Sequence, residues 1–132
     1  MRTSPLISIV DDDKTVRDAT ADLIMSLGYR AQTFSSGEAF LDSGELQHTD
    51  CLITDLQMPG LNGLELQARL LADGHRVPII FVTAFPQSAA RRRAFDSGAI
   101  AFLTKPFEER ALMDSIEMAL SQAATSSSRN LC

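Results

Sequence analysis

Short apolar segments alternate with segments of helical periodicity along most of the chain. The apolar segments have the length of strands, and in each longer segment apolar residues recur every three or four positions. Strict strand-helix alternation is typical of an α/β fold, a parallel sheet with helices on both faces. The pattern predicts five strands at residues 6–10, 30–34, 51–54, 78–82 and 99–103, and helices at residues 14–27, 63–73, 88–97 and 108–123, with a short helix opening at residues 35–38.

The polarity of the strands predicts their place in the sheet. Residues 30–34 are the most polar of the five, which favours an edge, whereas the inner strands are almost wholly apolar, as in sheets covered on both faces. Helical spacing predicts which side chains face the core. In the three longest helices these are Val16, Ala19, Leu23 and Leu27; Leu64, Ala68 and Leu71; and Leu112, Ile116, Ala119 and Ala123.

Composition places the chain in a narrow class. A length of 132 residues suits one domain, and 45% hydrophobic residues exclude wholesale disorder. The longest apolar run, Ala99 to Leu103, is far shorter than the ~20 residues of a membrane helix. The first residues lead into too short an apolar stretch for a secretory signal. We therefore expect a soluble, cytoplasmic domain.

The net charge and the cysteine content argue against several kinds of partner and site. Twelve Lys and Arg against 17 Asp and Glu give a net charge of −5, which argues against binding nucleic acid through its phosphates. Cys51 lies in an apolar segment and Cys132 is the last residue, so neither a disulfide framework nor a metal knuckle is indicated. Cys51 is expected to be an inert core residue. The polar residues 123–132 lack periodicity and predict a tail or the start of a linker.

Residues suited to catalysis or metal binding follow four of the five predicted strands, whereas the second strand is followed only by Ser35-Ser36. Asp11, Asp12 and Asp13 follow the first strand, Asp55 the third, Thr83 the fourth and Lys105 the fifth. Ligands of open α/β sheets bind at the carboxyl ends of the strands, where these side chains are expected to converge. Taken alone, each residue has an ordinary structural explanation. Asp55 could cap a turn or helix, Thr83 could bond to the backbone at the end of a strand, and Lys105 could be a solvent-exposed charge. Their convergence on one edge favours a site.

The acidic cluster requires a cation. Two carboxylates ~5 Å apart repel by about 3 kcal/mol at an effective dielectric constant of 20. Oxygen ligands without neighbouring His or Cys favour Mg²⁺, which takes a phosphate as co-ligand. Asp13, next to Lys14, is better explained as a helix cap or a solvent-exposed acid. Asp11, Asp12 and Asp55 are the candidate metal ligands.

Asp55 is the candidate nucleophile of the site. A carboxylate can attack phosphorus to form an aspartyl phosphate. The approach of two anions is then screened by a metal and an ammonium group. Lys105 supplies that ammonium, and Thr83 can donate a hydrogen bond to another phosphoryl oxygen.

Four short motifs in this order resemble the receiver domain of two-component response regulators over residues 5–122. They are Asp11-Asp12; Asp55 with Met58, Pro59 and Gly63; Thr83-Ala84; and Lys105-Pro106-Phe107. The surrounding residues are most similar to the FixJ-like branch. The resemblance implies a flavodoxin- or CheY-like (βα)5 fold with strand order 2-1-3-4-5, and makes residues 123–132 a tail or a linker to an output domain.

The resemblance also implies a mechanism. A sensor histidine kinase would donate a phosphoryl group to Asp55, with Mg²⁺ (or Mn²⁺) held by Asp12, Asp55 and the backbone carbonyl of Gln57. Asp11 would act mainly through a metal-bound water. Such a domain is a signalling switch, without enzymatic activity beyond its own phosphorylation and dephosphorylation.

The resemblance also implies how phosphorylation would change the conformation of the domain, starting from the new phosphoryl oxygens on Asp55. They would draw in Thr83 and Lys105, and Phe102 would rotate into the space that Thr83 vacates; ordinary core packing of Phe102 is an equally good interpretation. The change would reach the surface made by the fourth helix, last strand and last helix, where an output domain, a downstream protein or a second copy binds. Regulation of transcription is the expected response.

Three features depart from the family pattern. Phe102 lacks a hydroxyl group, so any switching works by packing alone. Phe85-Pro86 follows Thr83-Ala84, and the proline stiffens a loop that is expected to move. Phe85 is also placed to shield a phosphoryl group from water. Arg91-Arg92-Arg93 is either a solvated face or part of the output surface.

Other classes of function fit less well. A phosphatase with an aspartyl-phosphate intermediate would need a second acid two residues after Asp55, where Gln57 stands. A flavin-binding module would need a phosphate loop where Asp11, Asp12 and Asp13 stand. A receiver fold used constitutively as a docking module is the alternative that remains: the presence of all the expected ligands weakens it, but the Phe85-Pro86 loop keeps it open.

Overall fold

The sheet has the predicted parallel topology. The computed structural model describes residues 4–130, with side chains for residues 4–122. Five strands form one parallel sheet in the order β2-β1-β3-β4-β5. They are β1 (Leu6–Val10), β2 (Arg30–Phe34), β3 (Cys51–Asp55), β4 (Ile79–Thr83) and β5 (Ala101–Thr104).

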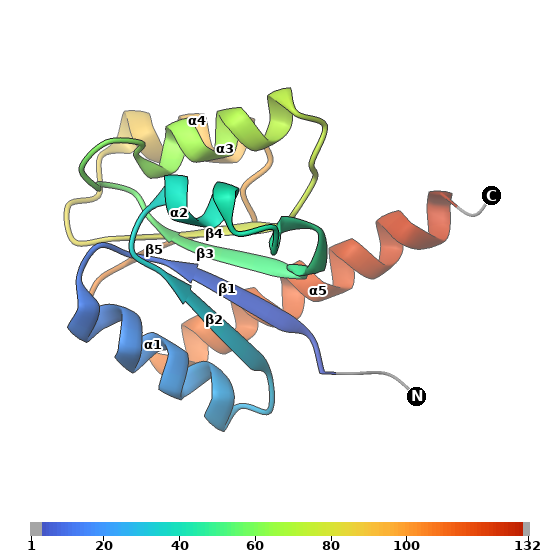
Figure 1. Ribbon diagram of the computed structural model, residues 1–132, viewed down its shortest axis with the longest axis horizontal. Helices are drawn as coiled ribbons and strands as arrows, with labels where there is room; N and C mark the ends of the chain where they lie inside the picture. Colours follow the sequence, from blue (N-terminus) through green and yellow to red (C-terminus); the bar gives the residue numbers. More distant parts are fainter. Residues whose placement is uncertain (1–3, 131–132) are drawn as a thin grey trace.

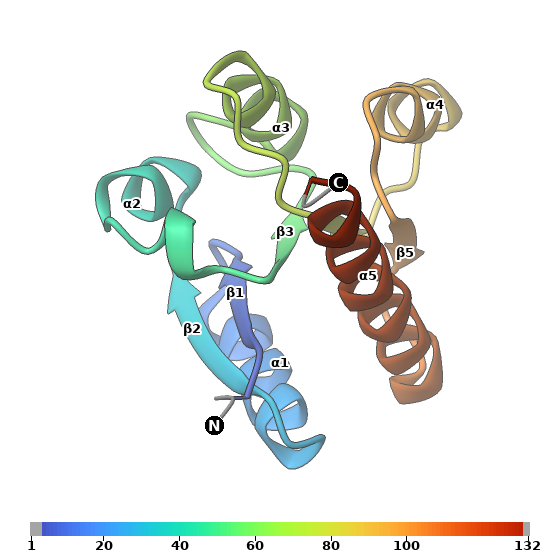
Figure 2. The ribbon, with the colours of Figure 1, turned by 90° about the vertical axis from the view of Figure 1, so that its right-hand side faces the viewer.

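Helices cover both faces of the sheet, which gives three layers (Figures 1 and 2). Helices α1 and α5 lie on one face and α2, α3 and α4 on the other, each side enclosing its own apolar cluster. The helices are α1 (Lys14–Ser26), α2 (Gly37–Asp42), α3 (Gly63–Ala72), α4 (Ser88–Asp96) and α5 (Glu109–Asn130), with a short 3₁₀ helix η1 (Leu46–His48) that the sequence pattern did not predict.

Burial along the strands follows their place in the sheet. Every residue of β1, β3 and β4 is buried, because these strands have neighbours on both sides and helices on both faces. Strand β2 is at the edge, with Arg30 and Thr33 exposed, which confirms the position predicted from its polarity.

The predicted buried faces of two helices were partly wrong, although Leu23 of α1 and Leu64 of α3 pack against the core as predicted. In α1, Ala19 is exposed, and the buried side chains are those of Thr20, Ala21 and Ile24. In α3, Ala68 and Leu71 are exposed, while Leu66 and Leu70 are fully buried. Both helices carry apolar residues on more than one stripe, so periodicity alone does not choose the stripe that meets the sheet.

Helix α5 is longer than predicted. Leu112, Ile116 and Ala119 are buried as expected, but the helix continues to Asn130 instead of ending near residue 123. The polar residues there include neither glycine nor proline, so nothing in the local sequence stops the helix. The side chain of Ala123 and the whole of Cys132 lie outside the described residues. None of the helices in the described part of the chain is long and apolar enough to span a membrane.

Candidate functional site

The predicted site residues lie at the edge of the sheet formed by the carboxyl ends of the strands. Asp11 directly follows β1, Asp55 and Thr83 are the last residues of β3 and β4, and Lys105 directly follows β5. The strand register aligns them, because Asp55 pairs with Val82 and Thr83 pairs with Thr104. The parallel topology therefore brings residues that are far apart in sequence to one edge.

The backbone around Asp11 is fixed from several sides. Its N–H donates to the carbonyl of Phe34, and its own carbonyl accepts from Arg17 Nη1 at 2.8 Å. Asp13 N donates to Asp11 Oδ1 at 2.9 Å. Asp13 itself is the N-cap of α1, with its carboxylate accepting from Thr15 N, so its predicted capping role is confirmed.

Asp11, Asp12 and Asp55 form one carboxylate cluster. Each offers an oxygen, and these oxygens all lie within 4.8 Å of one another. Asp11 and Asp55 are buried, whereas Asp12 is exposed. Buried and exposed carboxylates at this spacing match the oxygen-only, partly hydrated coordination that Mg²⁺ prefers, so the donor set fits the predicted metal.

Lys105 joins the two buried carboxylates. Its Nζ donates to Asp11 Oδ2 at 2.9 Å and to Asp55 Oδ2 at 3.2 Å. The Lys105 side chain is 17% exposed and the side chains of Asp11 and Asp55 are 2% and 12% exposed, so these ion pairs are mostly shielded from water. The peptide bond between Lys105 and Pro106 is cis.

Burial and charge change the acidity of this cluster. Burial raises the pKa of Asp55 above its ordinary value, and the charge of Asp11 adds to the rise, although Lys105 opposes it. Burial alone would lower the pKa of Lys105. Its hydrogen bond to Asp11 and the charges of both carboxylates outweigh that effect and raise the pKa.

The chain turns sharply after Asp55. Gln57 N donates to Asp55 Oδ1 at 3.3 Å, and Gly63 N donates to the carbonyl of Leu56 at 2.9 Å, which closes the loop. Gly63 is buried against this turn, and a β-carbon there would lie 2.5 Å from the carbonyl oxygen of Asp55. The turn that presents Asp55 therefore requires glycine at position 63.

Thr83 lies at the same edge with its hydroxyl turned to its own loop. The side chain is buried, and Oγ1 accepts from Phe85 N at 3.1 Å. The carbonyl of Thr83 accepts from Lys105 N at 2.8 Å, which ties the ends of β4 and β5 together. Among the hydrogen bonds of the described residues, none joins Thr83 to Asp55.

Phe102 packs inward. It pairs with Phe81 in the sheet register, and the two ring centroids lie 6.2 Å apart. Phe102 is partly buried against the apolar cluster on the side of α2, α3 and α4. This contact is ordinary core packing, and a role of Phe102 in switching stays a prediction.

Sequence reasoning missed two residues that hold the loops of the site. Arg17 binds the carbonyl of Asp11, and Glu38 accepts from the backbone N–H of Leu61 at 3.2 Å. Both are charged residues on helices, a pattern that ordinarily indicates a solvated face. Without the fold, no local signal distinguishes them from the other charged residues.

A family model described as the response regulator receiver domain matches residues 7–117. The chain belongs to this receiver domain family. Curated relatives include the response regulator protein TmoT of Ectopseudomonas mendocina, which is 43% identical over 89% of this chain and 54% of that protein. The transcriptional regulatory protein FixJ of Bradyrhizobium diazoefficiens is 37% identical over 93% of this chain and 60% of its own length.

The fold is shared with solved response regulators. The structure of response regulator StyR has a TM-score of 0.87 and 39% identity, covering 97% of this chain and 65% of that one. The chain spans about half the length of the curated relatives it matches. The predicted family and the predicted (βα)5 fold with strand order 2-1-3-4-5 are confirmed.

Proposed function

We propose that the chain accepts a phosphoryl group on Asp55 from the phosphohistidine of a sensor histidine kinase. A carboxylate oxygen of Asp55 bonds to phosphorus as the P–N bond of the donor breaks, and the electron pair returns to the imidazole nitrogen. The observation that carries this proposal is the position of Lys105, whose ammonium group binds Asp55 and Asp11 together inside a cluster of three carboxylates.

Asp11, Asp12 and Asp55 would hold Mg²⁺ (or Mn²⁺) in the active protein, together with the backbone carbonyl of Gln57. When bound, the ion screens the charge of the incoming phosphoryl group. The spacing of the three carboxylates supports this assignment. The role of the Gln57 carbonyl rests on the family resemblance.

Lys105 and Thr83 would bind the phosphoryl oxygens. Lys105 Nζ already lies at hydrogen-bond distance from Asp55, so it can move from the carboxylate to an oxygen of the product without a large displacement. Thr83 Oγ1 accepts from Phe85 N and keeps its own proton for donation. Turning this hydroxyl toward Asp55 would pull on the loop after β4 and couple phosphorylation to movement.

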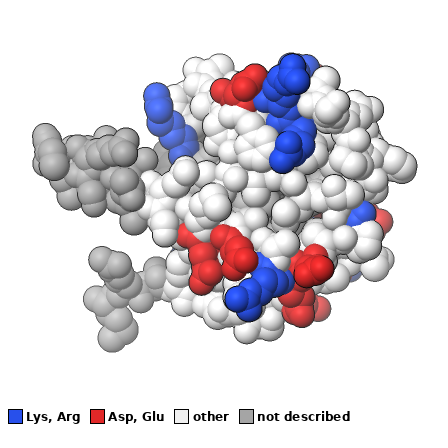
Figure 3. Space-filling view, turned by 180° about the vertical axis from the view of Figure 1, so that it is seen from behind, with Lys and Arg blue, Asp and Glu red and all other residues white. Residues whose placement is uncertain are grey.

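The output of the switch is proposed to pass through α4, β5 and α5. On this face basic side chains predominate over α4 and acidic side chains over α5, with a basic patch among the acidic ones (Figure 3). The exposed Arg91, Arg92 and Arg93 of α4 can therefore face the acids of α5 in a second copy of the chain. Such a surface would serve phosphorylation-linked dimerisation or an output domain that regulates transcription in the cytoplasm.

Mass spectrometry of the intact protein tests the phosphoacceptor. Wild type and Asp55→Asn are incubated with acetyl phosphate and Mg²⁺, with a chelator control. We expect one added phosphoryl group in the wild type and none in either control. A folded wild type that forms no adduct would contradict the proposal and favour a constitutive docking module, which the stiff Phe85-Pro86 loop also fits. An unchanged size-exclusion volume with beryllofluoride would count against dimerisation.

A further inference from the structure

We propose that Glu38 is a positioning residue that holds the loop after Asp55 in the shape needed for metal binding. This inference rests on the proposed function, because the loop, residues 57–62, contains Gln57, whose backbone carbonyl is proposed to bind the metal. Glu38 lies in the first turn of α2, an element that carries none of the three clustered carboxylates. It therefore acts through the backbone and touches no reacting atom.

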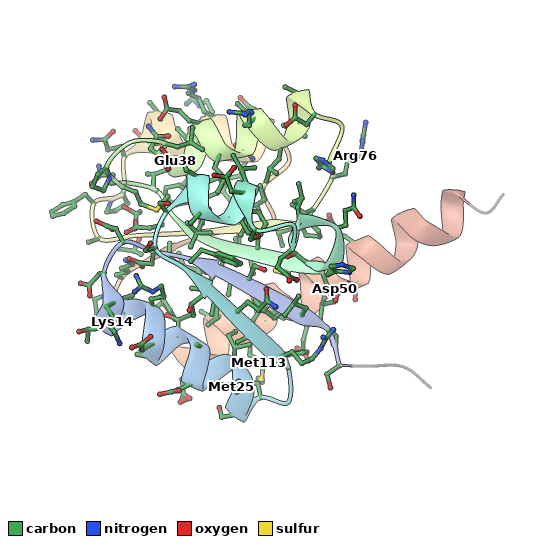
Figure 4. The ribbon with its side chains drawn as sticks, in the orientation of Figure 1. Lys14, Met25, Glu38, Asp50, Arg76 and Met113 are labelled. Atoms are coloured by element: carbon green, nitrogen blue, oxygen red, sulfur yellow. The ribbon has the colours of Figure 1, made fainter. Side chains whose placement is uncertain are left out.

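The contact between Glu38 and the loop is direct. Glu38 Oε2 accepts from Leu61 N at 3.2 Å, across 23 positions of sequence. The neighbouring Gly60 has a φ of +73°, and a β-carbon there would lie 2.8 Å from the same oxygen. Figure 4 shows Glu38 at the start of α2, beside the loop that joins β3 and α3. Glycine at position 60 thus permits both the turn and the close approach of the carboxylate.

Helix α2 is a firm support for this contact. Ser36 caps the helix by accepting from Ala39 N at 3.0 Å, and Phe40 is fully buried in the core. The start of α2 also packs against the side chain of Leu61, since a β-carbon at Gly37 would lie 3.1 Å from Leu61 Cδ2. Backbone and side chain of Leu61 are therefore both held by α2.

The other hydrogen bonds of the loop stay within the loop and its flanking elements, while Met58 packs the loop against the core. Asn62 N donates to Glu65 Oε1 at 2.9 Å, and Gly63 N donates to the carbonyl of Leu56. Both bonds stay within the loop and the start of α3. Among the hydrogen bonds of the described residues, the bond to Glu38 alone joins residues 57–62 to an element other than β3 and α3. Loss of this bond would leave the apolar packing of Met58 and Leu61 to hold the loop, and so would loosen the segment that carries the Gln57 carbonyl.

The test compares three variants with the wild type. Glu38→Ala removes the acceptor, Glu38→Gln keeps an acceptor oxygen, and Asp42→Ala removes an exposed acid from the end of the same helix. Mg²⁺ affinity is measured by calorimetry, the exchange of the Leu61 amide by NMR, and phosphorylation from acetyl phosphate by intact mass. Circular dichroism confirms that each variant is folded.

Glu38→Ala is expected to weaken Mg²⁺ binding by about three- to tenfold, the effect of one hydrogen bond. Its Leu61 amide exchanges faster, and its phosphorylation rate at saturating Mg²⁺ stays that of the wild type. Glu38→Gln is expected to restore most of the affinity, and Asp42→Ala to match the wild type. If the loss of negative charge were the cause, Asp42→Ala and Glu38→Gln would weaken Mg²⁺ binding as much as Glu38→Ala. That result would overturn the proposal.

Two further outcomes separate this proposal from the proposed function. Unchanged Mg²⁺ affinity in Glu38→Ala, with a wild type that binds Mg²⁺ and is phosphorylated, would overturn the positioning role alone. A wild type that neither binds Mg²⁺ nor forms an adduct would overturn both.

Discussion

A β-carbon at Gly63 would lie 2.5 Å from the backbone oxygen of Asp55, closer than any real carbon approaches an oxygen without displacing it. The first residue of α3 and the last residue of β3 are thus in direct backbone contact. The turn between them presents the Asp55 carboxylate to Asp11, Asp12 and Lys105. Packing at position 63 and the chemistry proposed for position 55 therefore depend on the same few atoms.

Gly63→Ala is expected to destabilise the fold by about 2 kcal/mol or more, because overpacking against backbone cannot be relieved by a rotamer change. Gly37→Ala is the matched control. Gly37 is the first residue of α2, and the atom nearest to a β-carbon there is the flexible Leu61 Cδ2 at 3.1 Å. We expect its effect to stay within about 1 kcal/mol. Urea unfolding measures the change in the free energy of unfolding for both variants. Equal destabilisation by Gly63→Ala and Gly37→Ala would contradict the prediction.

Lys105→Met is expected to lower the free energy of unfolding in chelator by about 3 kcal/mol, because it leaves two buried carboxylates without their cation. Added Mg²⁺ should recover part of the loss by replacing the missing charge. The exposed Lys14, paired with Asp18 on the surface of α1, provides the control. Lys14→Met should leave stability nearly unchanged. If Lys105→Met were equally harmless, the buried ion pairs would contribute nothing to the metal-free fold.

Asp55→Asn is expected to stabilise the metal-free protein at pH 7. The pKa of Asp55 is raised in the folded state, mainly by burial, so ionisation opposes folding. This cost is fully present above the folded pKa and disappears as the pH falls below the ordinary value of 3.8. The gain from Asp55→Asn should therefore shrink in acid. Unfolding curves in chelator between pH 3 and pH 8 test this, with Asp42→Asn as the control, and a gain that grows in acid would contradict it.

The sequence predicted the fold and the shared location of the candidate site residues because each is encoded locally. Strands alternate with helices, and Asp11, Asp55, Thr83 and Lys105 each end or directly follow a strand, so the parallel topology alone gathers them at one edge. The mutual contact of Asp11, Asp55 and Lys105 then follows from the strand order.

What the sequence could not predict depends on contacts between distant segments. The buried stripe of α3 is set by the face of the sheet it meets, so Leu66 and Leu70 are inside while Leu71 is exposed. The contact of Glu38 with Leu61 depends on how α2 packs, which no local pattern records. The direction of the Thr83 hydroxyl is also not encoded locally. In this conformation its oxygen accepts a hydrogen bond from the backbone of Phe85.

Phe85→Asn is expected to speed loss of the phosphoryl group, because an apolar ring near the phosphoryl group hinders attack by water. The Phe85 side chain is 67% exposed in this structure, so shielding requires the ring to turn over Asp55 after phosphorylation. Decay of the phosphorylated mass after removal of acetyl phosphate gives the rate. Met118→Asn, at another exposed apolar residue, is the control. An unchanged rate in Phe85→Asn would remove the shielding role.

Cys51 is expected to resist alkylation in the native protein. It is fully buried in β3, and burial raises the pKa of its thiol to about 12, so the reactive thiolate is scarce at pH 8. With Cys132→Ser removing the other thiol, iodoacetamide should label the chain only through unfolding. Labelling then follows the unfolding equilibrium, and adding Lys105→Met should accelerate it by roughly a hundredfold if that change costs about 3 kcal/mol. Rapid labelling of the stable protein at pH 8 would show that β3, the strand that ends at the proposed phosphoacceptor Asp55, opens locally.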